Sequence, residues 1–338
     1  MAVRRAIAAA PFGFDTWKNP GLFAGCSTGA PPDPYFTGGQ NWGFPPMHPE
    51  ACREDRYAYF IAALRNHMRH ADYLRLDHVM AFHRLFWIPD GGHAGDGVYV
   101  RYHAEEVYAI LCLESHRNRC RLVGENLGTV PPEVNSALHR HDLCGLYVAQ
   151  YEMQPSALRA LRPVPANCVA SVNTHDMPPI ATSWSGRDVD DRIKLDMLAD
   201  DRREGELEAR SKLRGALVEF LRKRGLLDVS LNGQVVGPSR EAAGAVRDAV
   251  LTFLGDSPAD FVLANLEDLW LETKWQNVPG TLDTHPNWRR KLKLSLEQLA
   301  SRPDIRELLL RLQETRKPGT AAGAASKPRS KPRKRAGS

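Results

Sequence analysis

The sequence of 338 residues lacks several patterns that would assign it to a common functional class. No apolar run approaches the roughly 20 residues that span a membrane, and the apolar stretch near the N-terminus is shorter than the core of an export signal. The six cysteines are scattered without a C-x-x-C pair, which indicates reduced thiols rather than metal ligands or disulfides. No glycine-rich nucleotide-binding loop follows a predicted strand. We therefore expect a cytoplasmic protein without a metal or cofactor.

Charge of both signs is present, but the positive charge is concentrated at one end. The chain has 45 Lys and Arg against 40 Asp and Glu, and residues 317–338 contain seven basic residues and no acidic residue. This segment is rich in Ala, Pro, Ser and Gly without large apolar side chains, so we expect a disordered basic tail. Residues 1–316 are close to neutral and predict no nucleic-acid-binding domain, so any contact of the tail with nucleic acid would be nonspecific.

Residues 1–316 alternate between strand-like and helix-like patterns. Hydrophobic residues make up 43% of the chain, which is enough for a large core. Short apolar runs are predicted as strands, and they occupy residues 73–76, 121–123, 146–150, 168–172 and 261–266. Amphipathic stretches are predicted as helices, and they occupy residues 56–69, 104–116, 132–141, 188–224, 289–299 and 304–314. Residues 11–50 are dense in Gly, Pro and aromatics, which indicates a long functional loop.

This alternation indicates a parallel α/β architecture. A doubly wound sheet and a (β/α)₈ barrel both fit the order of the elements. Carboxylates favour the barrel, because Asp77, Glu125, Asp176 and the neighbours Glu267 and Asp268 stand at or just after the ends of predicted strands. The C-terminal ends of all barrel strands converge on one face, where the active site lies. We therefore predict a (β/α)₈ barrel of the TIM type.

Three of these carboxylates suit the cleavage of a glycosidic bond with retention. Such cleavage needs two carboxyl groups about 5–5.5 Å apart, one ionised and one protonated, and Asp77 and Glu125 end consecutive predicted strands. Arg75 lies on the same face as Asp77, because side chains alternate along a strand, and can hold Asp77 ionised. Asp176 and the preceding His175 can bind sugar hydroxyls. Taken singly, each position also fits a structural ion pair, a helix start or a turn.

Five segments together resemble the amylomaltases, the 4-α-glucanotransferases also called disproportionating enzymes. They span nearly the whole chain except the tail, and the α-amylases share the order of the three carboxylates but not the first and last segments. The segments are GAPPDPYFTGGQNWGFPP (29–46), YLRLDHVMAFHRLFWIP (73–89), RLVGENLGTVPPEV (121–134), VNTHDM (172–177) and QNVPGT with HPNWRRKL (276–292).

The resemblance implies an activity and a role for each matching residue. It implies a retaining glucanotransferase that acts on maltooligosaccharides and other α-1,4-glucans. Asp77 is expected to be the nucleophile that forms a covalent glucosyl–enzyme intermediate, Glu125 the general acid and base, and Asp176 the third carboxylate, which binds and distorts the sugar. The expected substrate contacts are Arg75, His175, Asp33, Gln40, Trp42 and Asn277.

The resemblance also implies an incomplete barrel. Family members continue well upstream of the segment matching PFGFDTWKNPGLF (11–23), whereas this chain has strand-like segments for the fourth to eighth positions only, with a remnant of the third at residues 7–12. We expect residues 1–316 to be the C-terminal portion of the catalytic barrel, with strands 1–3 largely missing. Either the chain is a truncated product, which we favour, or a second polypeptide supplies the missing N-terminal segment. The alternatives in function are an α-amylase-type hydrolase and an inactive glucan-binding remnant.

Overall fold

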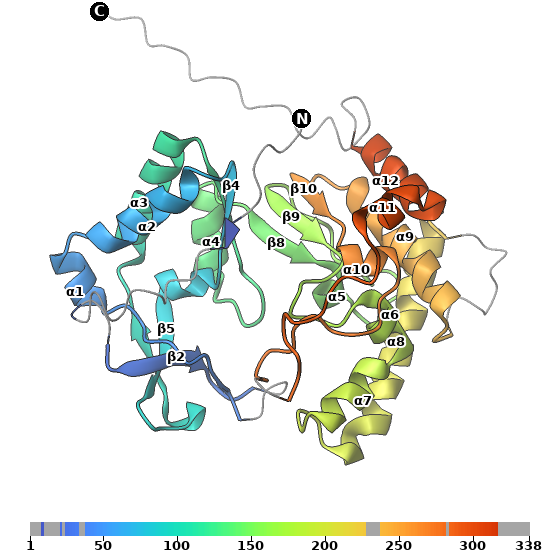
Figure 1. The fold of residues 1–338 in the computed structure, drawn as a ribbon, viewed down its shortest axis with the longest axis horizontal. Helices are drawn as coiled ribbons and strands as arrows, with labels where there is room; N and C mark the ends of the chain where they lie inside the picture. Colours follow the sequence, from blue (N-terminus) through green and yellow to red (C-terminus); the bar gives the residue numbers. More distant parts are fainter. Residues whose placement is uncertain are drawn as a thin grey trace, which may run out of the picture. The chain divides into compact units, whose positions relative to one another are not determined.

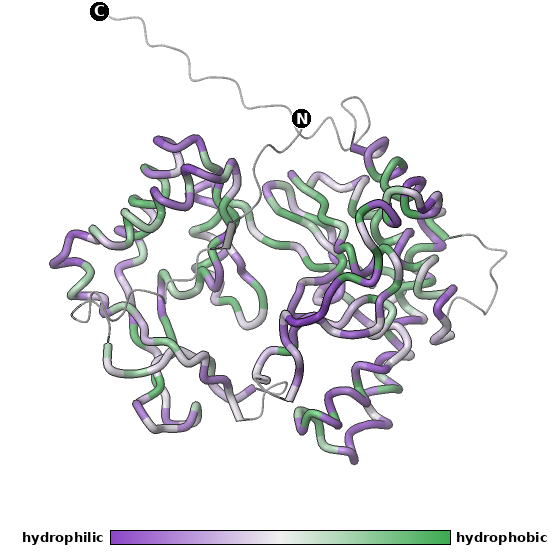
Figure 2. The backbone as a smooth tube through the Cα atoms, viewed as in Figure 1, coloured by the Kyte–Doolittle hydropathy of each residue, from purple (hydrophilic) through white to green (hydrophobic). Residues whose placement is uncertain are grey.

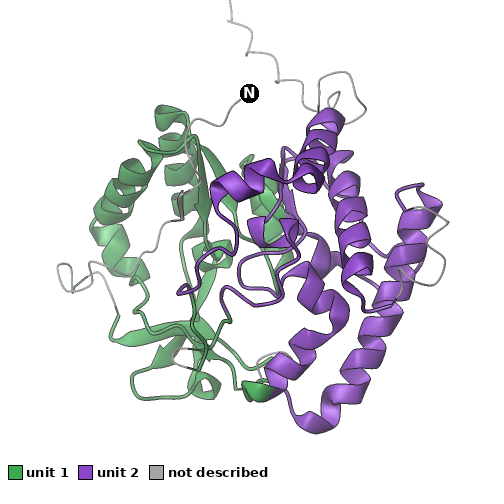
Figure 3. Cartoon of the chain, turned by 45° about the vertical axis from the view of Figure 1, so that its right-hand side comes forward, with its two compact units in different colours: residues 1–146, 194–197, 278–287 green, residues 147–193, 198–277, 288–338 purple. Residues whose placement is uncertain are grey.

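The structure, a computed structural model, describes residues 8–9, 21, 24–33, 38–227, 237–281 and 284–316. The predicted tail at 317–338 lies outside the described residues, as does most of the segment 7–23. The chain forms two compact units (Figure 3). Unit 1 comprises residues 1–146, 194–197 and 278–287, and unit 2 comprises residues 147–193, 198–277 and 288–338. Each unit buries an apolar cluster of its own.

A parallel sheet of three short strands organises unit 1. Its strands are β1 (Ala8–Ala9), β4 (Tyr73–Leu76) and β7 (Arg121–Gly124), in the order β1-β4-β7. β4 and β7 pair along their full length, and Leu76 stands opposite Gly124 at their ends. The strands predicted at 73–76 and 121–123 are confirmed, and β1 lies within the predicted remnant of a further strand.

Helices cover this sheet because β4 buries every second side chain. Leu74 and Leu76 have no exposed surface and pack in one cluster with apolar residues of the three main helices of the unit. Figure 1 shows helices of this unit beside β4, and in Figure 2 apolar and polar colours are mixed along these helices. The helices are α2 (Ala58–Met68), α3 (Ala104–Asn118) and α4 (Pro132–Arg140).

The predicted helices at 104–116 and 132–141 are therefore confirmed. Helix α2 begins two residues later than predicted, because Arg56 and Tyr57 adopt positive φ angles of 54° and 55°. A separate short helix, α1 (Pro49–Glu54), precedes this break.

A second, antiparallel sheet in unit 1 was not predicted. Its order is β3-β2-β5-β6, and it includes part of the segment that we expected to be a loop. The backbones of its first two strands approach closely at Gly29, where a Cβ atom would lie 2.0 Å from the carbonyl oxygen of Gln40. The strands are β2 (Cys26–Ala30), β3 (Gln40–Asn41), β5 (Arg84–Pro89) and β6 (Val98–Arg101). Three short helices complete the region around it: η2 (Val79–Phe82), η3 (Ala94–Asp96) and α1.

Unit 2 is organised by the sheet β10-β9-β8, in which β9 and β10 are parallel. The strands are β8 (Gly145–Val148), β9 (Cys168–Ser171) and β10 (Phe261–Leu263). The long helix α9 (Arg240–Gly255) packs against both β9 and β10, because its buried face carries Val246, Val250 and Leu254. The other helices are α5 (Ala149–Glu152), α6 (Ile180–Ser185), α7 (Arg187–Lys194), η4 (Asp200–Arg202), α8 (Arg203–Lys223), α10 (Leu266–Leu269), α11 (Leu296–Ser301) and α12 (Pro303–Thr315).

Several boundaries in unit 2 differ from the predictions. The helical stretch predicted at 188–224 is split into α7 and α8, and Asp196 between them has a positive φ of 56°. The strand predicted at 261–266 ends at Leu263, because α10 begins at Leu266. The helix predicted at 289–299 is wrong in its first half, since α11 begins only at Leu296, where the Ser295 side chain caps it. The helix predicted at 304–314 is confirmed as α12.

The alternation of parallel strands and helices confirms the α/β class. No helix within the described ranges combines the length and the apolar character that crossing a membrane requires. All six cysteines are free, and four of them are buried.

Candidate active site

Asp77 and Glu125 directly follow the ends of two neighbouring parallel strands. Leu76 and Gly124, the residues before them, are partners in the β4–β7 pairing, so both carboxylates leave the sheet at the same level. Adjacent strands lie about 4.8 Å apart, which suits the roughly 5–5.5 Å between the carboxyl groups of a retaining pair. The side chain of Asp77 is 62% exposed, whereas Glu125 is only 9% exposed. One carboxylate therefore faces solvent and the other is buried.

Arg75 forms the expected ion pair with Asp77. Its Nη2 lies 2.6 Å from Asp77 Oδ1, because the two residues are separated by one position along an extended chain and point to the same side. A charge-assisted contact of this kind favours the ionised carboxylate. Arg75 thus places a positive charge directly beside the exposed carboxylate.

Glu125 is held by main-chain donors on both of its oxygens. The N–H of His78 donates to Oε2 at 2.9 Å, and the N–H of Leu127 donates to Oε1 at 2.7 Å. Burial raises the pKa of Glu125, and the negative charge of Asp77 raises it further. The two main-chain donors and Arg75 oppose this rise without cancelling it. Glu125 therefore keeps its proton to a higher pH than an ordinary glutamate does, as a general acid requires.

His78 joins the carboxylate pair to the segment around Trp42. It has a left-handed backbone with a φ of 46°, and its N–H is the donor to Glu125. The imidazole meets the Trp42 ring edge-on, with centroids 4.9 Å apart. Burial lowers the pKa of His78 to about 4, although Asp77 opposes the change. The ring is therefore neutral at ordinary pH.

The three predicted substrate-binding residues that precede β4 lie in or next to the antiparallel sheet. Asp33 follows β2, Gln40 lies in β3, and Trp42 follows β3. Gln40 Oε1 accepts a hydrogen bond from Trp42 Nε1 at 3.2 Å, and the N–H of Trp42 donates to the carbonyl of Thr28 in β2. The Trp42 ring also stacks on Phe44, with centroids 6.2 Å apart. These contacts bring Gln40 and Trp42 to the carboxylate pair through His78. Asp33 follows β2 as an exposed residue, and its contact with substrate stays a prediction.

Asp176 stands in unit 2 with two of the other predicted residues. The Asn277 amide donates to Asp176 Oδ1 at 2.6 Å, and His175 Nε2 lies 3.1 Å from Oδ2. The N–H of Asp176 donates to Thr174 Oγ1, which helps to fix the turn. The side chain of Asp176 is 40% exposed and that of His175 is 46% exposed. This cluster offers an anionic acceptor, an imidazole and an amide to a polar ligand.

A buried hydrogen-bond network centred on Asp268 holds the segment that leads into the turn at residues 174–176. Asp268 accepts hydrogen bonds from the Asn173 amide (2.8 Å) and from the N–H of Ile180 (2.9 Å). Asn265 donates in turn to the carbonyl of Asn173. Desolvation by burial raises the pKa of Asp268 to about 6, against the effect of its donors and of Arg247. Asp268, predicted to stand just after the last strand, follows β10 within α10 and is 2% exposed, so it is a buried residue.

Three features of the site were missed from the sequence. His78 directly follows Asp77, and this adjacency alone could have pointed to it as a site residue. Asn173 precedes the THD turn, but its partner Asp268 is 95 residues away. Trp288 lies in the segment HPNWRRKL, and its ring is 5.2 Å from that of His175. None of the three has a spacing that distinguishes it from an ordinary packing residue.

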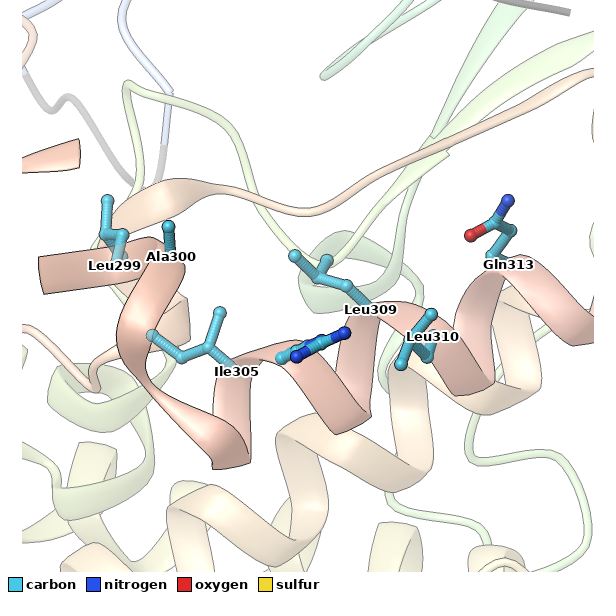
Figure 4. Close-up of a pocket in the computed structure, with 7 residues that line it drawn as sticks. Leu299, Ala300, Ile305, Leu309, Leu310 and Gln313 are labelled. Carbon is cyan, nitrogen blue, oxygen red and sulfur yellow. The ribbon is translucent and has the colours of Figure 1, made fainter. Parts of the chain in front are cut away.

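Neither a metal-binding cluster nor a carboxylate at the hollow along α11 and α12 is found among the described residues. Within the described ranges, no group of three or more His, Cys, Asp or Glu side chains is arranged to hold a metal ion. The hollow along α11 and α12 is mostly apolar (Figure 4), and no carboxylate lines it. Its lining residues are Leu299, Ala300, Ile305, Arg306, Leu309, Leu310 and Gln313.

Residues 5–296 match the sequence profile of the 4-alpha-glucanotransferase family. The chain is 32% identical over 303 residues to a 4-alpha-glucanotransferase of Haemophilus influenzae, covering 89% of this chain and 43% of that protein. It is 37% identical over 290 residues to one of Mycobacterium bovis, covering 84% of this chain and 39% of that protein. The chain thus spans about two fifths of the length of these relatives.

Among solved structures, amylomaltase from Corynebacterium glutamicum superposes with a TM-score of 0.77 at 27% identity, covering 92% of this chain and 46% of that one. An amylomaltase from Streptococcus agalactiae in complex with acarbose has a TM-score of 0.68 at 18% identity, covering 92% of this chain and 57% of that one, which supports the fold alone.

Proposed function

Because the chain belongs to the 4-alpha-glucanotransferase family, we propose that it transfers α-1,4-glucan segments between maltooligosaccharides. The observation that carries this proposal is the contrast between the two neighbouring carboxylates. Glu125 is buried with a raised pKa, and Asp77 is exposed and paired with Arg75. A retaining reaction requires one protonated and one ionised carboxyl group.

In the first step, a carboxylate oxygen of Asp77 attacks the anomeric carbon of the donor glucan. The bond between that carbon and the glycosidic oxygen breaks as Glu125 transfers its proton to the oxygen. The products are a glucosyl ester on Asp77 and a released shorter sugar, and Glu125 is left ionised. Arg75 holds the attacking carboxylate by its ion pair with Asp77 Oδ1.

In the second step, the 4-hydroxyl of an acceptor sugar attacks the same carbon. Glu125 takes the hydroxyl proton, the ester bond to Asp77 breaks, and both carboxylates return to their starting states. Two inversions give net retention. Water competes with the acceptor, so the aromatic residues Trp42 and Phe44 would favour transfer by excluding water and holding the acceptor sugar.

Asp176 takes the third role in this proposal. Its carboxylate, with His175 and Asn277, binds sugar hydroxyls, which the hydrogen-bonding capacity of the cluster supports. Gln40 and Asp33 contribute polar groups on the acceptor side. In this proposal, strands β4, β7, β8, β9 and β10 would be the fourth to eighth strands of a (β/α)₈ barrel, with β1 as the remnant of the third.

Incubation of the 338-residue chain with maltotriose tests the proposal. Transfer of a maltosyl unit between two maltotrioses yields glucose and maltopentaose, and transfer of a glucosyl unit yields maltose and maltotetraose. Thin-layer or anion-exchange chromatography separates the released sugar from the longer product. Asp77→Asn is the control, and it is expected to abolish both products. Formation of glucose and maltose without longer products would show a hydrolase instead. Binding of maltotriose without turnover would show an inactive glucan-binding chain.

A further inference from the structure

Trp288 is an exposed aromatic residue on a strained stretch of backbone in unit 2. It is 58% exposed, although tryptophan is usually largely buried. Its φ is 59°, a left-handed value that is rare for bulky residues and costs on the order of 1 kcal/mol or more. Neither its exposure nor its conformation is explained by packing within a core.

The backbone that carries Trp288 is fixed to the segment that carries Asn277. The N–H of Trp288 donates to the carbonyl of Gln276 at 3.1 Å. Arg290 donates to the carbonyls of Lys274 (2.6 Å) and Trp275 (2.9 Å) and pairs with Glu272 at 3.5 Å. These contacts fix the backbone that carries the exposed ring in its strained conformation, and a fixed backbone is one requirement of a preorganised contact surface.

The indole lies next to the polar cluster of Asp176. Its centroid is 5.2 Å from that of His175, with the rings tilted by 47°. His175 is 3.1 Å from Asp176, and Asn277 donates to the other oxygen of the same carboxylate. An aromatic face therefore adjoins an acceptor, an imidazole and an amide, and all four residues belong to unit 2.

A pyranose ring matches this combination of groups. One face of a glucose unit presents C–H bonds, which the electron-rich face of an indole attracts, and its rim presents hydroxyls that need hydrogen-bond partners. We propose that Trp288 is the aromatic platform of a glucose-binding subsite whose polar rim is Asp176, His175 and Asn277. The choice of an α-1,4-glucan as ligand rests on the proposed function.

The test measures binding rather than turnover. Isothermal titration of maltohexaose into the full chain is carried out for the wild type and for Trp288→Ala, Trp288→Phe and Leu296→Ala. Trp288→Ala is expected to raise the Kd roughly three- to tenfold, the value of one aromatic contact, whereas Trp288→Phe keeps most of the affinity. Leu296 is 70% exposed in the same unit, so Leu296→Ala controls for loss of an exposed apolar side chain and should bind like the wild type.

A second measurement covers the case in which Trp288→Ala does not fold. The fluorescence present in the wild type and missing in Trp288→Phe belongs to Trp288, and maltohexaose should protect this component from acrylamide quenching. An unchanged Kd in a folded Trp288→Ala, no protection, or no binding of maltohexaose by the wild type each overturns the subsite. Weaker binding by Trp288→Ala with no transfer by the wild type supports the subsite and overturns the transfer function. Normal transfer by the wild type with an unchanged Kd for Trp288→Ala overturns the subsite and supports the transfer function.

Discussion

At the scale of single residues, burial separates the tasks of two neighbouring carboxylates. Asp77 and Glu125 follow paired strand ends, yet one is mostly exposed and ion-paired while the other is almost fully buried. Desolvation disfavours the charged form of a carboxyl group and an adjacent cation favours it. The same sheet edge thus provides an exposed, ion-paired carboxylate and a buried carboxyl group that keeps its proton to higher pH.

This division predicts a selective defect in Glu125→Gln. Glutamine keeps the shape of the side chain but cannot donate the proton, so transfer from maltotriose should fall by roughly 10²- to 10⁴-fold. α-Maltotriosyl fluoride needs little protonation of its leaving group, so kcat/KM for fluoride release, which reports the first step alone and is measured with an ion-selective electrode, should be far less affected. Asp77→Asn should lose both activities. Equal loss of both activities in Glu125→Gln would refute the assignment of Glu125 as the acid.

The pH dependence follows from the sign of the same pKa shift. A raised pKa keeps Glu125 protonated to higher pH, and the acid form is lost as the pH rises through that pKa. kcat/KM for maltotriose should therefore decline on the alkaline side. The decline should be much weaker with the fluoride substrate, which does not use the acid.

Of two side-chain contacts near the predicted carboxylates, one could be predicted from the sequence and the other could not. Period-two alternation predicts that Arg75 and Asp77 share a face, because that rule is local, and the ion pair is present. The adjacency of Trp288 to His175 could not be predicted in this way. It depends on a positive φ and on hydrogen bonds from residues 288–290 to residues 274–276, none of which leaves a periodic signal.

At the scale of elements, the parallel strands were predictable and the antiparallel sheet was not. β4, β7 and β9 are short apolar runs followed by helices, which is the pattern of a parallel α/β protein. β2 and β5 instead pair across more than fifty residues, from Cys26↔Pro89 to Gly29↔Phe86. The glycines and prolines of the 11–50 segment suggested a loop, although Gly29 in fact allows β2 and β3 to approach closely.

Replacing glycine by alanine should have opposite effects on stability at the crowded Gly29 and at the open Gly215. Gly29→Ala places a Cβ 2.0 Å from Gln40 O and 2.5 Å from the side chain of Ile88, so we expect a loss of about 1–3 kcal/mol in the free energy of unfolding. Gly215→Ala, in the interior of α8, meets nothing within 4 Å and should add about 0.5–1 kcal/mol. Urea titration followed by circular dichroism measures both.

Because β3 carries Gln40, the Gly29 substitution should also impair activity, by displacing the partner of Trp42. Gly215→Ala should leave transfer unchanged. A Gly29→Ala protein as stable as the wild type would contradict the role given to this glycine.

At the scale of the whole molecule, the apolar core is divided. The two large buried clusters lie in different units, one in unit 1 and one in unit 2, and a small third cluster lies in unit 1. The predicted site residues are divided as well: unit 1 holds Asp33, Gln40, Trp42, Arg75, Asp77 and Glu125, and unit 2 holds His175, Asp176 and Asn277. The strand–helix order predicted the α/β class, but a contact-based division into two units has no counterpart in composition or periodicity.

The buried Asp268 makes the stability of the molecule depend on pH. Its pKa of about 6 in the folded state lies above the ordinary aspartate value of 3.8, so between these values the folded protein binds more protons than the unfolded one. The free energy of unfolding then falls as the pH rises from about 4 to about 6, by roughly 3 kcal/mol from this group, and is constant above that range.

Asp268→Asn removes this titration, so the difference in unfolding free energy between the wild type and the variant should shrink by about that amount across the same range. Contributions of other groups are shared by the two proteins and cancel in the difference. Urea titrations between pH 4 and pH 7 give the values, and Glu267→Gln, which removes a neighbouring carboxylate from the same helix, is the matched control. A difference that does not vary with pH would mean that Asp268 is ionised throughout, held by Asn173, Ile180 and Arg247 more strongly than burial opposes it.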